Sequence, residues 1–125
     1  MKIKNKIIII LLILFVVFLC TSCKKKEEKY ELYQVKSLVT NEESPLFNEY
    51  EYYYLTLDYK DNTIFIEYKF KNESENKIKN GTFVIENNEM TITLENDTIQ
   101  AKINEQENTI IVNLVVLEFY YKKIN

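Results

Sequence analysis

Alternation of apolar and polar residues with a period of two limits the fold of this chain more than any other feature of its sequence. It is plain in "YYLTLDYK" and "TIFIEYKF", two segments joined by the polar stretch "KDN". Because successive side chains of a strand point to opposite faces, the pattern predicts two strands joined as a β-hairpin. The residues predicted to share the buried face are Tyr53, Leu55, Leu57, Tyr59, Ile64, Ile66, Tyr68 and Phe70.

The second half of the chain repeats this pattern between Asn-rich turns. "GTFVIENNEMTITLENDTIQAKINEQENTIIVNL" divides into four strands, and "LEFYYKK" forms a last one after a slip of phase across Leu114–Val116, where we expect a turn or bulge. Asn and Asp tolerate the left-handed backbone of tight turns, and such short connections require antiparallel neighbours. The predicted inward residues are Phe83, Ile85, Met90, Ile92, Leu94, Ile99, Ala101, Ile103, Ile110, Val112, Leu117, Phe119 and Tyr121.

A first strand near Tyr30, in "YELYQVKSLV", brings the total to about eight. We expect a loop or short helix over Thr40–Glu49 and a solvated loop over Lys71–Asn80. The predicted fold class is therefore all-β, with antiparallel strands in an up-and-down meander. Closure into a small barrel removes exposed strand edges. At eight strands, the interior is either filled by side chains or holds one small ligand.

The N-terminus has the layout of a secretory signal. "MKIKNK" has three lysines and no acid, and Ile7–Cys20 follows without a polar side chain. The apolar run is shorter than the roughly 20 residues of a spanning helix and fits the h-region of a signal peptide. Since the lysines would stay in the cytoplasm, we expect the rest of the chain to be exported.

Both cysteines lie at the end of this run, in "LCTSC". The stretch resembles a bacterial lipobox, with Thr21 and Ser22 as the small residues and Cys23 as the acceptor, although Cys20 stands where Leu is usual. The resemblance implies a diacylglyceryl group on Cys23 and cleavage before it. The expected divisions are a signal peptide over 1–22, a lipidated basic tether over 23–29 and one barrel domain over 30–125, held at a membrane of the cell envelope.

Other interpretations of the two cysteines remain open. An uncleaved signal anchor is one, and a C-x-x-C redox pair or a zinc site are two more. A redox pair belongs in a βαβ context that this sequence lacks. A zinc site needs more ligands, and the chain has no His and no third Cys.

Charge restricts the possible partners. The 103 residues that remain after cleavage carry a net charge of −6, and the body from Tyr30 onward has 9 lysines against 17 acidic residues. There is no Arg and no basic patch in the body, which argues against nucleic acid. The lysines next to Cys23 can meet anionic head groups. They are Lys24, Lys25, Lys26 and Lys29.

We expect the protein to be a monomer.

The order "GTFVIENNEMTITLENDTIQAKI…TIIVNL…LEFYYKK" resembles small bacterial lipocalin-like (calycin-type) lipoproteins. In that family a G-T-aromatic strand precedes an "I-T-L" strand, and an aromatic strand closed by lysine ends the chain. The resemblance covers roughly Tyr30–Lys123. It implies a non-enzymatic, membrane-anchored barrel that binds a small apolar or amphipathic ligand.

Few residue types here can carry catalysis. Without His, most nucleophile–base pairs are excluded, and the carboxylates sit at turns or on outward positions, as at Glu86, Glu89, Glu95 and Asp97. Paired acids can hydrolyse glycosides, and turn acids can bind calcium, but no EF-hand loop is present. We expect no enzyme activity, no metal and no cofactor.

"NEYEYYYLTLDY" is the most unusual stretch, with five tyrosines between Tyr50 and Tyr59. Strict alternation places Tyr50, Tyr52 and Tyr54 on the outer side, where they form a candidate partner surface. Tyrosine is enriched at interfaces, but it also favours strands, and β-propensity alone is the simpler explanation of the stretch. The alternative function is an interaction or inhibitor protein that uses an acidic, tyrosine-rich surface, for example against a basic cell-wall hydrolase.

Overall fold

The computed structural model describes residues 4–12 and 27–125. Residues 4–12 form a helix within the predicted signal segment. Cys23, the predicted lipidation site, lies outside the described residues. In the described part of the chain, no helix has the length and apolar character needed to cross a membrane.

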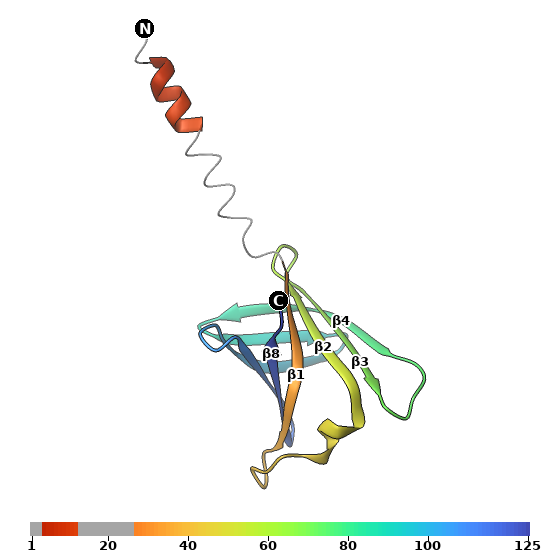
Figure 1. Cartoon of the computed structure of the whole chain (residues 1–125). Helices are drawn as coiled ribbons and strands as arrows, with labels where there is room; N and C mark the ends of the chain where they lie inside the picture. The colour runs from red at the N-terminus through yellow and green to blue at the C-terminus, as the bar shows by residue number, and fades with distance from the viewer. Residues whose placement is uncertain (1–3, 13–26) are drawn as a thin grey trace.

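Eight antiparallel strands follow one another around a closed barrel, as the sequence predicted (Figure 1). Each strand pairs with the next along the chain, and the last pairs with the first. A 3-10 helix, η1 (Pro45–Glu49), lies within the segment expected to be a loop or short helix. The strands are β1 (Glu27–Ser37), β2 (Tyr50–Asp58), β3 (Thr63–Phe70), β4 (Lys77–Glu86), β5 (Glu89–Leu94), β6 (Asp97–Asn104), β7 (Thr109–Leu114) and β8 (Leu117–Lys123).

The inward face of the barrel matches the period-two pattern. Every side chain predicted to face inward between Phe83 and Tyr121 is buried or packs against the core. Each fully buried aliphatic or aromatic side chain contributes about 1.5–3 kcal/mol of transfer free energy. The buried set is Tyr30, Leu32, Val35, Leu55, Leu57, Ile64, Ile66, Phe83, Met90, Ile92, Leu94, Ala101, Ile103, Ile110, Val112, Phe119 and Tyr121. The core, which is wholly apolar and aromatic, thus fills the barrel.

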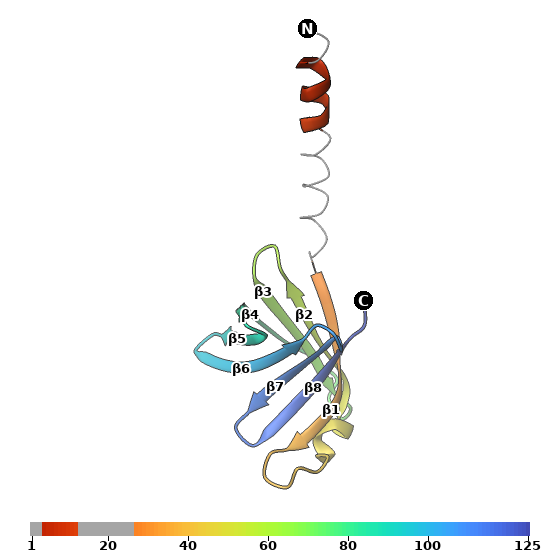
Figure 2. The same ribbon diagram turned by 90° about the vertical axis from the view of Figure 1, so that its left-hand side faces the viewer.

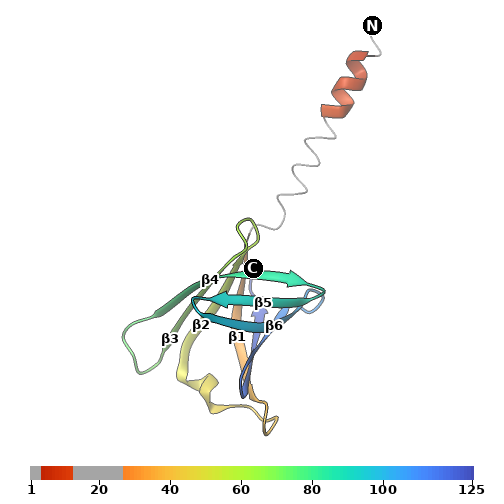
Figure 3. The ribbon, with the colours of Figure 1, turned by 180° about the vertical axis from the view of Figure 1, so that it is seen from behind.

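Strand β4 is longer than predicted. Lys77–Asn80, expected to be part of a solvated loop, pairs with β3 and is exposed throughout. The prediction was wrong because this end of the strand has no buried face to create alternation, and backbone pairing alone defines it. Figure 3 shows β4 running from its neighbour β3 toward β5. Its pairing with β5 begins only at Gly81.

Strand β1 is divided between two neighbours in the same way. It begins at Glu27, so the end of the predicted tether belongs to the barrel, where Glu27–Glu31 pairs with β2. From Tyr30 onward β1 pairs with β8. The two strands β1 and β2 therefore separate beyond Glu31, and η1 lies beside this separation, next to the end of β1 (Figure 2).

The turn predicted from the phase slip is present at Val115 and Val116, between β7 and β8. The N–H of Leu38 donates to the carbonyl oxygen of Val116 at 2.8 Å, so the loop after β1 lies against this turn. Both connections are at the end of the barrel opposite the start of β1 (Figure 1).

Candidate functional site

The barrel interior offers little space for a ligand. A cavity of about 90 Å³ remains between the inward side chains. Small-molecule sites usually measure about 300–1,000 Å³, so this cavity is well below the usual size. Its lining residues are Tyr53, Leu55, Ile66, Lys79, Ile92, Leu94, Ile99, Val112, Leu114 and Tyr121. Lys79 is the only charged residue in the described part of this lining, and because it is exposed, the cavity reaches the surface beside β4.

A cluster of tyrosines packs at the inner side of β2. The Tyr53 ring is stacked on that of Tyr68 at 4.9 Å between centroids, and it lies 5.5 Å from the Tyr121 ring. Burial raises the pKa of Tyr53 and, even more, that of Tyr121, and the hydrogen bond between the two hydroxyls also raises the pKa of Tyr121. Tyr53 and Tyr121 are therefore neutral at physiological pH.

Tyr50 belongs to this inner cluster, contrary to the prediction that placed it outside. Its ring is 5.0 Å from the Tyr53 ring and is stacked on Phe70 at 4.8 Å. The cause is a bulge: Tyr50 pairs with Phe70 and Tyr52 pairs with the next residue, Lys69. Glu51 is the extra residue, so Tyr50 and Tyr52 occupy successive positions and face opposite sides.

The other two predicted residues of the partner surface do lie together. The rings of Tyr52 and Tyr54 are stacked, with centroids 5.5 Å apart. The ammonium of Lys29 is 4.3 Å from the centre of the Tyr54 ring. This geometry favours a cation–π contact between Lys29 and Tyr54.

A second pair of outer rings, Tyr33 and Tyr120, was not part of the predicted surface. Their centroids are 6.2 Å apart in an edge-to-face arrangement, and the Lys36 ammonium lies 5.3 Å from the centre of the Tyr120 ring. Tyr33 is the extra residue of a bulge in β1, between Leu32 and Gln34. The sequence has no signal for this bulge, although alternation did place Tyr120 outside.

Two hollows lie on either side of η1, where β1 and β2 separate. The larger, of about 380 Å³, is between β1 and η1, and the smaller, of about 80 Å³, is between η1 and β2. Phe47 lines both. The larger is lined by Tyr33, Gln34, Val35, Glu43, Ser44, Pro45, Phe47 and Asn48, and the smaller by Glu31, Leu32, Phe47, Tyr50, Glu51, Tyr52 and Tyr53.

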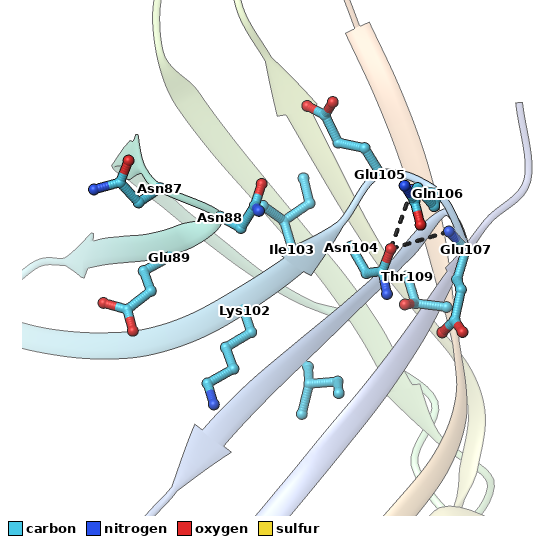
Figure 4. Close-up of a pocket in the computed structure, with 11 residues that line it drawn as sticks. Asn87, Asn88, Glu89, Lys102, Ile103, Asn104, Glu105, Gln106, Glu107 and Thr109 are labelled. Carbon is cyan, nitrogen blue, oxygen red and sulfur yellow. Dashed lines mark hydrogen bonds between the residues drawn. The ribbon is translucent and has the colours of Figure 1, made fainter.

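A broader hollow of about 690 Å³ lies between the β4–β5 and β6–β7 turns, and its walls are mostly amides and carboxylates (Figure 4). Asn104 accepts hydrogen bonds from the backbone N–H groups of Gln106 and Glu107 at 3.1 Å, and it thereby holds the β6–β7 turn. No aromatic ring among the described residues lines the hollow. Its apolar lining is limited to Ile103 and Ile111, whereas a typical binding pocket is lined mainly by apolar side chains.

The barrel as a whole is acidic. Residues 27–125 contain all 19 acidic residues of the chain but only 10 of its 16 lysines, which gives a net charge of −9. Glu86, Glu89, Glu95 and Asp97 are all exposed, as expected from their positions. Across the residues that the structure describes, no three His, Cys, Asp or Glu side chains gather closely enough to hold a metal ion.

The fold and these surfaces define a small, closed, antiparallel β-barrel with a filled interior and aromatic rings on its outer face. Comparison of the chain with protein-family models, curated protein sequences and solved structures found no match. The barrel and its surfaces are thus the basis for inferring function.

Proposed function

We propose that this protein is exported, anchored by a lipid on Cys23, and binds a positively charged macromolecular partner through the outer face of its barrel. The stacked outer pair Tyr52 and Tyr54 is the observation that carries the proposal. Tyrosine is enriched at binding surfaces, and an acidic barrel attracts a basic partner at long range. The filled interior favours this function over enclosure of a ligand of ordinary size.

The anchor is tested by Cys23→Ser in the native host. Without a thiol to acylate, the variant carries no acyl chains, and we expect it to move from the membrane to the soluble fraction. Cys20→Ser is the matched control and should stay in the membrane. Membrane retention of Cys23→Ser to the wild-type extent would refute lipid anchoring at this residue.

The partner surface is tested by photo-crosslinking in intact cells. A benzophenone amino acid is placed at Tyr54 or, as a control, at Val84, which is 66% exposed on the outer side of β4. We expect the probe at Tyr54 to give a discrete crosslinked protein with a basic isoelectric point, and the probe at Val84 to give none. The yield should fall as salt rises, because salt screens the attraction.

Equal crosslinking at the two positions, or none from Tyr54, would contradict a partner surface on this face. A discrete acidic partner would contradict the electrostatic part of the proposal. Cell lysis assays with added lysozyme provide a direct check of one basic hydrolase, and full-length protein should slow lysis if that enzyme is the partner.

A lipocalin-like carrier function is the second candidate, and the apolar cavity beside Lys79 favours it. A cavity of about 90 Å³ fits only the end of an acyl chain unless the side chains move, and the ammonium of Lys79 suits an anionic head group. Native mass spectrometry of the full chain, released gently from host membranes, should then show a bound mass that is lost in Lys79→Gln. A clean apo mass would remove this candidate.

A further inference from the structure

The separation of β1 and β2 creates a small site whose two walls come from different parts of the chain. The larger hollow has the β1 side chain Tyr33 on one side and the η1 residues Pro45 and Phe47 on the other. Tyr33 and Phe47 are 44% and 37% exposed, so their rings are accessible from solvent. The walls therefore offer apolar surface for the stem of a side chain that enters from outside.

The η1 helix that forms one wall is held in place by its ends and by the core. The Ser44 hydroxyl accepts a hydrogen bond from the N–H of Leu46 at 3.2 Å, and the Tyr50 N–H donates to the carbonyl oxygen of Phe47. Leu46 packs against the barrel core. With Leu46 turned inward, the neighbouring Phe47 is left at the surface, between the two hollows.

The charged residues that line this site are all acidic. Within residues 4–12 and 27–125, no lysine lines either hollow, whereas Glu31, Glu43 and Glu51 are present. The connecting segment 38–49 adds Glu42 and Glu49 and contains no basic residue. Glu51 forms an ion pair with Lys69 of β3, which leaves Glu43 as the carboxylate of the larger hollow. The nearby Lys36 ammonium lies over the Tyr120 ring.

Glu43 is the acidic group best placed to receive a cation. Its Oε1 accepts a hydrogen bond from the side-chain amide of Gln34 at 2.9 Å, and the pairing of Lys36 with Glu43 fixes the backbone there. A carboxylate has about four acceptor sites, so this one bond leaves further acceptor capacity. Ser44 and Asn48 supply more oxygen atoms to the same hollow.

From this arrangement we infer that the hollow between β1 and η1 takes a single arginine or lysine side chain of the basic partner. The inference rests on the proposed function and names the contact by which that partner is held. The aliphatic stem lies between the Tyr33 and Phe47 rings, and the cationic end meets Glu43. An anionic ligand is disfavoured by the surrounding carboxylates, and a purely apolar side chain leaves the polar groups of the hollow without new partners.

The test is NMR titration of the ¹⁵N-labelled full chain in detergent micelles with the acetylated, amidated peptide Gly-Ser-Arg-Ser-Gly. A second peptide replaces Arg with citrulline, which has nearly the same shape and no charge. We expect the Arg peptide to shift the amide signals of Tyr33, Glu43 and Phe47. The citrulline peptide should bind at least about fivefold more weakly, the loss expected for one charge-assisted contact.

Phe47→Ala should weaken binding of the Arg peptide at least about fivefold. Phe65→Ala is the matched control, because Phe65 on β3 is also 37% exposed but does not line either hollow, and it should bind as wild type does. Glu43→Gln is a second variant that leaves the apolar walls unchanged. It should also weaken binding, with a spectrum that remains dispersed.

Shifts spread over the whole acidic surface, or equal affinity for the Arg and citrulline peptides, would overturn the inference. Wild-type affinity in both Phe47→Ala and Glu43→Gln would do the same. The proposed function is tested separately, by crosslinking from Tyr54. If that crosslinking persists in Phe47→Ala, the partner surface is supported and the hollow is rejected as its contact site. If the probe at Tyr54 forms no crosslink in the otherwise wild-type protein, the proposed function itself is refuted.

Discussion

Asparagine is the residue that shapes the turns of this barrel. Six described residues have a positive φ angle, and none is glycine. Five are Asn, whose short polar side chain tolerates the left-handed conformation. They are Asn41, Asn62, Asn87, Asn88 and Asn108. The sixth is Glu95, with φ of 46°, in the turn between β5 and β6.

Glu95→Gly should stabilise the protein, because glycine adopts a positive φ without the steric cost that a longer side chain bears. We expect the free energy of unfolding, measured by urea titration, to rise by about 0.5–1 kcal/mol. Glu107→Gly is the matched control: it removes the same charge from an exposed turn residue whose φ is not positive, and it should give no gain. Equal effects of the two changes would mean that charge, and not backbone conformation, is responsible.

At the scale of the strand, β4 allows the barrel to close. It pairs with β3 from Lys77 to Thr82 and with β5 from Gly81 to Glu86, so the two ladders overlap only at Gly81 and Thr82. At this crossing the backbone of β5 is very close. A Cβ on Gly81 would lie 2.2 Å from the carbonyl oxygen of Thr93 and 2.6 Å from Cδ2 of Leu94. The single glycine of the chain is thus required by a close approach of two strands.

Gly81→Ala should therefore destabilise the barrel. The clash is with backbone, so the ladder between β4 and β5 must shift, and overpacking of this kind costs about 1–3 kcal/mol or more. Urea denaturation should show the lower free energy of unfolding, while Asn80→Ala, one residue away and exposed, should change it by less than about 0.5 kcal/mol. A Gly81→Ala protein as stable as the wild type would show that the crossing has room for a methyl group.

For the whole molecule, the core depends on neutral tyrosines. Burial raises the pKa of Tyr30, Tyr50, Tyr53 and Tyr121, and it raises the pKa of Tyr59 to about 12, with the nearby carboxylate of Glu28 adding to that shift. In the unfolded chain these hydroxyls ionise near pH 10. Between the two pKa values the folded state therefore holds protons that the unfolded state has released.

The stability of the barrel should consequently be fully present below about pH 10 and fall as the pH rises above it, because the unfolded state binds fewer protons there. Denaturation curves at pH 7, 9, 10.5 and 11.5 measure this. Tyr59→Phe removes one of the titrating groups, so its curve should fall less steeply than that of the wild type between pH 10 and 12. Lysine titration is common to both proteins and cancels in the comparison; parallel curves would contradict the assignment.

Much of this architecture follows from the sequence alone. About eight strands, most of their inward residues, a turn or bulge over Leu114–Val116 and a loop or short helix before β2 were predictable, because a period of two and Asn-rich turns act locally along the chain. Closure could be expected as well, since it removes strand edges. Of the predicted partner surface, the sequence correctly brought Tyr52 and Tyr54 together.

Only the tertiary structure decided the features that depend on register between strands. The bulge at Glu51 turns Tyr50 into the core, and the bulge at Tyr33 aligns that ring with Tyr120. The division of β1 and β4 between neighbours came from closing the ring of strands, and it left the hollow beside Phe47. Bulges and strand sharing are set by how distant ladders fit around the whole barrel, and a pattern within one strand does not record them.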